Sequence, residues 1–238
     1  MIEFGCIVSA AGQGERLGSG IPKALVPIAG TPMLVHALRT VAAHPAIRSI
    51  AVVAPPGHLD QVRQMTATID TEIPLVIVAG GAQRSDSVRA GLAALPAGST
   101  GVLVHDAARP FAPYDVFDRV ITQVSVDVPA VIPGLPVVDT IKQVDESDTV
   151  LATPARANLR AIQTPQGFTR DVLSRALAQP GADATDDAAL VERLGLPVQV
   201  VAGHPNAFKI TTPTDLLIAE DLVARAVDPG ARTHGHRE

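Results

Sequence analysis

The sequence is poor in cysteine, in aromatic residues and in long apolar runs. Its single cysteine, Cys6, rules out disulfide bonds within the chain, and the apolar run around it predicts a small buried side chain. No uncharged run reaches the roughly 18 apolar residues of a membrane-spanning helix. The first residues lack the basic and apolar regions of a secretory signal. These absences predict a cytoplasmic protein that does not enter a membrane.

Positive charge is also scarce, and most of it is arginine. The net charge is −5, which excludes the basic surface that binding to a nucleic acid requires. The 19 basic residues include only three lysines, Lys23, Lys142 and Lys209. Arginine supplies positive charge elsewhere in the chain, so a retained lysine suggests a site that needs a compact ammonium group.

Apolar runs alternate with helical patterns along most of the chain. Hydrophobic residues make up 47% of the sequence, which is enough for a full core. Thr31 and Pro32 predict the start of the first helix, which ends at His44 and Pro45. Strands are predicted at residues 4–8, 50–54, 75–79, 102–104, 128–132 and 198–201. Further helices are predicted at residues 58–69, 84–95, 113–125, 169–178 and 186–194, and a last one opens at residues 212–215.

This alternation predicts the fold class. Continuously apolar strands that alternate with helices are typical of a parallel sheet buried on both faces. We therefore expect an α/β protein with a Rossmann-like, mostly parallel sheet covered by helices on both faces. The length of 238 residues suggests a single domain over residues 1–228, followed by a disordered tail at 229–238.

Residues 137–153 interrupt the alternation. Two strand-like segments rich in β-branched residues, 137–144 and 149–151, flank a polar turn at 145–148. Such a hairpin has no place in a parallel sheet. It predicts a projecting β-arm, whose strand edges would be exposed unless a second chain covers them.

The first predicted strand leads into a loop of small residues at positions 9–18, with Pro22 and Lys23 shortly after it. Glycines allow backbone N–H groups to approach a ligand closely, and polyphosphates gain most from such an approach. The loop is not a Walker motif, because Lys23 is followed by alanine, and it lacks the third glycine of the dinucleotide-binding pattern. It therefore favours another kind of nucleotide-phosphate loop, with a flexible surface turn as the alternative.

Polar and small residues also follow several other predicted strands. In an open α/β sheet, ligands bind beyond the carboxyl ends of the strands. The segments at those ends include residues 80–88, 105–110 and 164–166. They contain neither the order of a catalytic triad nor the Cys/His spacing of a zinc site, so hydrolase and zinc functions lack support.

Each of these segments also has a simpler structural interpretation. Residues 80–81 can form a plain turn, and Ser87 can face solvent on a helix. Asp106 can cap a helix and pair with Arg109, while Thr185 can cap the helix that follows it. Their joint placement at one edge of the sheet favours a binding site.

Taken in order, the motifs resemble those of one enzyme family. They are Ala-Ala-Gly-x-Gly-x-Arg-x-Gly with Pro-Lys, Gly-Gly to Ser-Val at 80–88, His-Asp-Ala-Ala-Arg-Pro at 105–110, Asp-Thr-Ile-Lys at 139–142, Gln-Thr-Pro-Gln at 163–166 and Thr-Asp at 185–186. The series resembles the 2-C-methyl-D-erythritol 4-phosphate cytidylyltransferase family. The resemblance implies transfer of CMP from CTP to 2-C-methyl-D-erythritol 4-phosphate, with release of pyrophosphate, in the non-mevalonate synthesis of isoprenoid precursors.

The resemblance also assigns roles to individual residues. Two cations are implied to hold the triphosphate and stabilise the reacting α-phosphate, Arg16 and Lys23. The residues implied to bind the nucleotide are Ala10, Ala11, Gly12, Gly81, Ala82, Ser87 and Ala107. The residues implied to bind the second substrate are Asp106, Arg109, Thr140, Arg156, Thr164, Thr185 and Lys209.

The resemblance further implies a magnesium ion held mainly by the phosphates of CTP, with no metal ligands from the protein, and a homodimer formed through the β-arm. Exchanged arms would let Thr140 and Arg156 serve the neighbour's site. This sequence departs from the family's usual pattern at Ser9, where proline is common, and at Ala82, where many members have aspartate. The second departure leaves a backbone contact as the expected role of residue 82.

The chemistry of such a reaction fits these residue types. A phosphate monoester oxygen is already anionic, so it attacks the α-phosphorus of CTP without a general base. The protein must bring two polyanions together, which needs cations and N–H donors. Two alternatives remain, a ribitol 5-phosphate cytidylyltransferase and a non-catalytic nucleotide-binding regulator. The presence of both Arg16 and Lys23 argues against the regulator.

Overall fold

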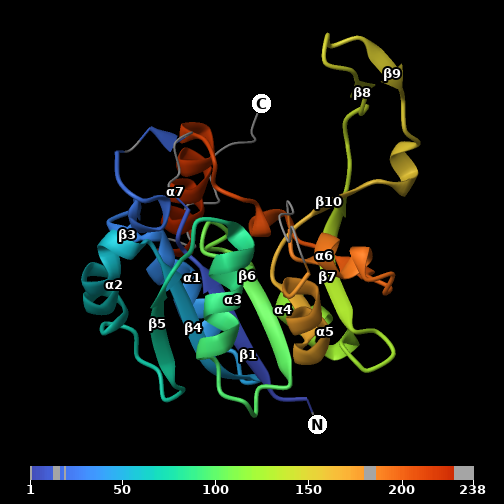
Figure 1. Cartoon of the computed structure of the whole chain (residues 1–238). Helices are drawn as coiled ribbons and strands as arrows, with labels where there is room; N and C mark the ends of the chain where they lie inside the picture. Colours follow the sequence, from blue (N-terminus) through green and yellow to red (C-terminus); the bar gives the residue numbers. More distant parts are fainter. Residues whose placement is uncertain (1, 13–16, 19, 180–185, 228–238) are drawn as a thin grey trace, which may run out of the picture.

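The computed structural model describes residues 2–12, 17–18, 20–179 and 186–227. In these residues, helices cover both faces of a large sheet, and a long arm extends from one end of it (Figure 1). The expected α/β class with a mostly parallel sheet is confirmed. None of the helices in these ranges is long and apolar enough to cross a lipid bilayer. The single-domain boundary at residue 228 stays a prediction, and the predicted tail at 229–238 lies outside the described residues.

The central sheet has eight strands in the order β10-β7-β11-β6-β1-β4-β5, with β12 also paired to β7. Their bounds are β1 (Phe4–Ser9), β4 (Ile47–Ala54), β5 (Leu75–Ala79), β6 (Gly101–Asp106), β7 (Ala130–Pro136), β10 (Arg160–Ile162), β11 (Gln166–Thr169) and β12 (Gln199–Ala202). Strands β6, β1, β4 and β5 run parallel, whereas β11 lies antiparallel between β6 and β7. The carboxyl ends of the four parallel strands therefore meet at one edge of the sheet.

The central strands separate two cores. Cys6 and Val8 of β1 belong to the core beneath α1 (Met33–Ala43), α2 (Leu59–Thr66) and α4 (Tyr114–Gln123). Ile7 belongs to the opposite core, beneath α3 (Arg84–Ala94), α5 (Arg170–Leu177) and α6 (Ala188–Arg193). Successive residues of a strand point to opposite faces, so a strand covered on both faces is apolar throughout. Cys6 is a buried free thiol, as predicted, and burial raises its pKa.

A third, smaller core supports the segment that follows the glycine loop. Helix α7 (Pro213–Val227) contributes the fully buried Ala219 to a cluster with Ile28 of β2 (Pro27–Ile28) and Met33 at the start of α1. Leu17 and Val26, on either side of the short helix η2 (Lys23–Leu25), join the same cluster. Packing against α7 therefore steadies the backbone that carries Lys23.

The arm begins where β7 ends. Strand β8 (Gln143–Val144) pairs with β9 (Val150–Ala152) in a separate two-stranded sheet (Figure 1). Asp145 closes the turn by accepting hydrogen bonds from the backbone N–H groups of Ser147 and Thr149, both at 2.9 Å. Val138 and Leu151 are 78% and 60% exposed. The projecting hairpin is confirmed, although its paired strands are shorter than predicted.

Two local predictions fail for identifiable reasons. Thr31 does not cap α1, because it pairs with Ile28 across the hairpin of β2 and β3 (Thr31–Pro32), and Pro32 takes the N-cap position. The apolar pattern also misses β11, which has only four residues, one of them glycine. A Cβ atom at Gly167 would lie 2.5 Å from Cγ1 of Val120, so packing against α4 requires the residue that weakens the strand pattern.

Candidate active site

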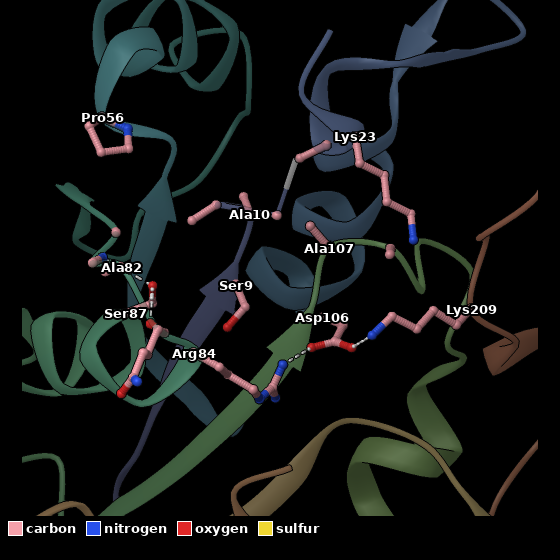
Figure 2. A pocket seen from close by; sticks show the side chains of 17 residues that line it. Ser9, Ala10, Lys23, Pro56, Ala82, Arg84, Ser87, Asp106, Ala107 and Lys209 are labelled. Carbon is pink, nitrogen blue, oxygen red and sulfur yellow. Dashed lines mark hydrogen bonds and ion pairs between the residues drawn. The ribbon is translucent and has the colours of Figure 1, made fainter. Parts of the chain in front are cut away.

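The carboxyl ends of β1, β5 and β6 border a pocket of about 940 Å³ (Figure 2). Its volume is in the range of sites for small molecules and cofactors. The predicted site residues that line the pocket are Ala10, Ala11, Gly12, Lys23, Gly81, Ala82, Ser87, Asp106, Ala107 and Lys209. The pocket is also lined by residues that had no predicted role, Ser9, Ala24, Pro56, Gly80, Gln83, Arg84 and Ala108.

The loops that follow β1 and β5 form one wall of the pocket, and their backbones lie close to each other. A Cβ atom at Gly80 would lie 2.5 Å from the Cβ atom of Ala11, so only glycine allows the two loops to touch there. Ser87 Oγ accepts a hydrogen bond from the Gly81 N–H at 3.1 Å and donates to the Gln83 carbonyl at 3.2 Å. Ser87 is therefore buried and holds the loop in place, and the interpretation of a solvent-facing side chain is wrong.

A chain of ion pairs crosses the floor of the pocket. One oxygen of Asp106 accepts from Arg84 Nη1 at 2.9 Å, and the other accepts from Lys209 Nζ at 2.7 Å (Figure 2). Arg84 Nη2 donates in turn to Asp187 Oδ2 at 2.7 Å. Asp106 is thus held by two cations from distant parts of the sequence.

These contacts set the ionisation of Asp106. Burial by itself would raise the pKa of its carboxyl group, but the charges and hydrogen bonds of Arg84 and Lys209 outweigh burial. The pKa of Asp106 therefore lies well below its usual range. The carboxylate stays charged at neutral pH, and neither of its oxygens lacks a cation.

Lys23 enters the pocket from the opposite wall. It begins η2 directly after Pro22, whose φ of −54° lies in the narrow range that the proline ring imposes. Figure 2 shows its side chain extending from η2 toward the ends of β1 and β6, where Ala107 lies. The pocket therefore receives ammonium groups from two segments, η2 and the segment that carries Lys209.

Other predicted site residues lie outside this pocket. Thr140 and Arg156 are exposed on the arm, where Arg156 Nη1 donates to the Val138 carbonyl at 2.5 Å. Arg109 donates to the carbonyls of Ala207 at 2.7 Å and Ile162 at 3.2 Å, and the direct pair with Asp106 is not formed. Arg16 and Thr185 lie outside the described residues.

Thr164 supports the pocket from behind. Its Oγ1 accepts a hydrogen bond from the Asp106 N–H at 3.0 Å and lies 3.1 Å from His105 Nδ1. Both side chains are buried. Burial lowers the pKa of His105 to about 4, with the charge of Asp106 and a backbone hydrogen bond to Arg109 opposing the shift in part. His105 is therefore neutral at physiological pH and ties the end of β6 to Thr164.

This burial predicts a pH dependence of stability. The pKa of His105 is about 4 in the folded protein and near 6.5 in the unfolded chain, so the unfolded state binds more protons between these values. The free energy of unfolding should fall by up to about 3 kcal/mol as the pH drops from 6.5 to 4. Denaturant titrations across this range test the prediction. An unchanged pH slope in His105→Asn would contradict the assignment to His105.

Two participants in the ion-pair chain, Arg84 and Asp187, were not predicted as site residues. Arg84 carried a usable signal, because it lies in the segment that follows β5. The only sequence signal for Asp187 was its position directly after the Thr-Asp pair at 185–186. Ser9 Oγ and Arg84 Nε are buried and have no hydrogen-bond partner among the described residues. Buried polar atoms are normally satisfied, so a ligand or water at the pocket floor would complete them.

The described residues do not gather the side chains of a protein-held metal centre. They contain no group of three or more histidine, cysteine, aspartate or glutamate side chains placed to hold an ion. Asp106, the carboxylate in the pocket, has both oxygens engaged by cations. A metal ion at this site would have to take most of its ligands from a bound substrate.

Transfer of a nucleotidyl group between phosphates requires backbone donors and cations that face one another across an open pocket. The carboxyl edge of this sheet places Lys23 and Lys209 in one pocket with the small residues that follow β1 and β5, an arrangement that fits the class of α/β nucleotidyltransferases. A sequence model of the 2-C-methyl-D-erythritol 4-phosphate cytidylyltransferase family matches residues 4–225. The chain belongs to this family of cytidylyltransferases, whose enzymes use CTP.

Individual relatives agree with the family assignment. The 2-C-methyl-D-erythritol 4-phosphate cytidylyltransferase of Streptomyces avermitilis is 50% identical over 227 residues, which cover 92% of this chain and 91% of the relative. The solved 4-diphosphocytidyl-2C-methyl-D-erythritol synthase of Anaerococcus prevotii superimposes with a TM-score of 0.82 at 30% identity, covering 94% of this chain and 99% of the other. The Thermus thermophilus cytidylyltransferase structure gives a TM-score of 0.73 at 35% identity, with coverage of 94% and 100%.

Proposed function

We propose that this pocket transfers CMP from CTP to 2-C-methyl-D-erythritol 4-phosphate, releasing pyrophosphate and forming 4-diphosphocytidyl-2-C-methyl-D-erythritol. One observation carries the proposal. Small residues at 10–12 and 80–82 face the ammonium-bearing residues Lys23 and Lys209 within a single pocket. A nucleoside triphosphate needs this combination, because its base requires a closely fitting wall and its phosphates require positively charged groups. The family to which the chain belongs is named for the same reaction.

The small-residue wall suits the nucleoside part of CTP. We assign Ala10, Ala11 and Gly12 to contacts along the nucleotide, and residues 81–82 with Ser87 to the cytosine. The Gly81 N–H already meets Ser87 Oγ, so the loop has a defined shape before a base enters. Ala82 offers only a methyl group, and its proposed contact with the base is through the backbone. Ala107, which is buried at the end of β6, is assigned to the ribose side.

CTP should be preferred over ATP, GTP and UTP. A purine is too large for a pocket that closely spaced loops confine, so kcat/KM with ATP should be at least about 10-fold lower. UTP carries a carbonyl where CTP carries an amino group, and backbone groups that accept from the amino group would then face an acceptor. Steady-state rates with all four nucleotides test this. Equal turnover with ATP would refute the assignment of the small-residue wall to a pyrimidine.

The reaction itself needs charge more than acid–base chemistry. A phosphate oxygen of the second substrate attacks the α-phosphorus of CTP, and the bond to the pyrophosphate oxygen breaks. The nucleophile is anionic at neutral pH, so no residue has to remove a proton. Arg16 and Lys23 are proposed to hold the triphosphate and to offset the charge that develops at the α-phosphate.

The second substrate is proposed to bind between this pocket and the arm of a neighbouring chain. The assigned residues are Asp106, Arg109, Thr140, Arg156, Thr164, Thr185 and Lys209. The exposed apolar residues Val138 and Leu151 favour a homodimer in which a partner chain covers the arm. Thr140 and Arg156 do not line their own chain's pocket, which supports their use in the partner's site.

A magnesium ion fits this site only if it binds together with the nucleotide. The donors available in the pocket are few, because Asp106 is neutralised by Arg84 and Lys209. Phosphate oxygens of CTP and water would supply most of its ligands. When bound, the ion would reduce the negative charge on the triphosphate.

Pyrophosphate release separates the candidate functions. Purified protein should release pyrophosphate from CTP with 2-C-methyl-D-erythritol 4-phosphate and release much less with ribitol 5-phosphate. Preference for ribitol 5-phosphate would replace the proposed second substrate. Binding of CTP with no release in the presence of either polyol phosphate would indicate a nucleotide-binding regulator.

A further inference from the structure

Asp187 is an acidic side chain in the ion-pair chain that lies outside the pocket. It occupies the N-cap position of α6, and its side chain is only 1% exposed. Arg84 Nη2 donates to its Oδ2 at 2.7 Å, across 103 positions of sequence. Asp187 is not among the residues that line the pocket. Its ion pair with Arg84 connects it to the pocket lining.

Arg84 is held in one orientation by two carboxylates. Its Nη1 donates to Asp106 and its Nη2 donates to Asp187, so the plane of the guanidinium cannot turn without breaking a charged hydrogen bond. Burial would lower the pKa of Arg84, but the two carboxylates together raise it, so its charge is secure. A lysine could not reproduce this bridge, because its single ammonium lacks the forked geometry.

Asp106 couples the orientation of Arg84 to that of Lys209, because it contacts both side chains. Arg84 takes Asp106 Oδ1 and Lys209 takes Oδ2, so the carboxylate sets the distance between the two cations. The side chain of Lys209, which lines the pocket, is 40% exposed, whereas the Asp106 side chain is 9% exposed. The accessible end of the chain is therefore an ammonium group, and the buried end is Asp187.

The chain of ion pairs joins three elements, of which α3 and β6 contribute residues to the pocket. Arg84 is the first residue of α3, Asp106 ends β6, and Asp187 precedes α6. Asp186, next to Asp187, accepts from Gln166 Nε2 at 2.9 Å. A buried ion pair is weak support for stability, because desolvation offsets much of the attraction. The series of ion pairs ends at Lys209 in the pocket, which points to a role beyond stability.

We propose that Asp187 and Arg84 are positioning residues for the second substrate, which hold the Asp106 carboxylate and, through it, the Lys209 ammonium in the orientation that receives a polyol phosphate. The inference rests on the proposed function of the pocket. Asp187 would touch neither substrate. The two residues extend the site to the start of α6.

The decisive comparison uses Arg84→Gln/Asp187→Asn. Arg84→Gln leaves Asp187 without its cation and leaves Asp106 with Lys209 alone, so it should lower the thermal midpoint. Asp187→Asn leaves Arg84 with Asp106 as its one carboxylate and should lower the midpoint less. The double variant no longer contains the unpaired charge of Asp187, and Asp106 keeps Lys209, so its midpoint should lie above that of Arg84→Gln. Its KM for 2-C-methyl-D-erythritol 4-phosphate should nevertheless stay at least about 10-fold raised, while its KM for CTP changes much less.

A conservative variant and a matched control complete the experiment. Arg84→Lys keeps the charge and loses the bridge, so it should show the same raised KM for the polyol phosphate. Arg119→Gln/Asp115→Asn removes an arginine–aspartate pair of α4 that is joined at 2.8 Å, is more exposed than the Arg84–Asp187 pair and lies outside the pocket, and it should leave both KM values unchanged. A wild-type KM for the polyol phosphate in Arg84→Lys, or in the folded double variant, would overturn the inference. Absence of pyrophosphate release by the wild-type enzyme would instead overturn the proposed function.

Discussion

Replacing Lys23 with arginine should slow turnover about 100- to 1000-fold while leaving the affinity for CTP nearly normal. The chain contains 16 arginines and three lysines, so arginine would be the expected cation here if charge alone sufficed. Pro22 restricts the backbone immediately before Lys23, and packing of Val26 and Leu17 under α7 supports the same segment. The ammonium is therefore delivered from a restrained backbone.

The size of this effect follows from where charge appears in the reaction. A compact ammonium can reach a single α-phosphate oxygen as negative charge develops there, whereas a wide guanidinium favours two oxygens at once. An interaction made only in the transition state lowers kcat when it is lost and leaves KM little changed. Lys23→Arg should thus separate binding from catalysis.

Calorimetric titration with CTP and steady-state kinetics measure the two quantities separately. Lys142→Arg, on the exposed arm, is the matched exchange, since the Lys142 ammonium donates to Thr153 at 2.7 Å and lies outside the pocket. It should keep most of the activity. Near-normal kcat in Lys23→Arg, or a loss confined to CTP affinity, would make Lys23 a ground-state phosphate anchor and contradict the proposal.

Heterodimers of Lys23→Ala and Arg156→Ala chains should recover about half of wild-type activity, although each homodimer is nearly inactive. If arms exchange, one site of the heterodimer combines the intact Lys23 of one chain with the intact Arg156 of the other. The second site lacks both side chains. The heterodimer therefore regains activity, because one of its two sites has both side chains intact although each chain carries one substitution.

Two affinity tags on the two chains allow the heterodimer to be isolated before its pyrophosphate release is measured. A tagged wild-type pair gives the reference activity. A second control pairs a wild-type chain with a chain that carries both substitutions, and it should keep about half of the reference activity only if each site uses the arm of its own chain. In the shared arrangement, that pair has one defect in each site and is nearly inactive. Inactive heterodimers of the first kind would show that Arg156 serves its own chain.

Local patterns were enough to predict most of the fold. Continuous apolar runs identify β1, β4 and β5. In β1 and β4 the run reflects burial on both faces, which favours apolar residues at successive positions, whereas β5 lies at the edge of the sheet and is only partly buried. The pattern fails at β11, where Gly167 is required by packing against Val120. It also fails at Thr31, whose pairing with Ile28 in a short hairpin prevails over its preference for a helix cap. In both cases a contact with another element decides the local structure.

The sequence by itself determined the order of the main helices and parallel strands, the projecting arm and the set of segments that meet at the carboxyl edge of the sheet. These follow from local periodicity and from the direction of parallel strands. Only the tertiary structure decided which charges meet. The simpler structural interpretation of the sequence paired Asp106 with Arg109, three residues away in the chain, but Asp106 pairs with Arg84 and Lys209, which are 22 and 103 positions away. Ion pairs between elements depend on where packed helices and strands aim their side chains, and spacing along the chain carries little of that information.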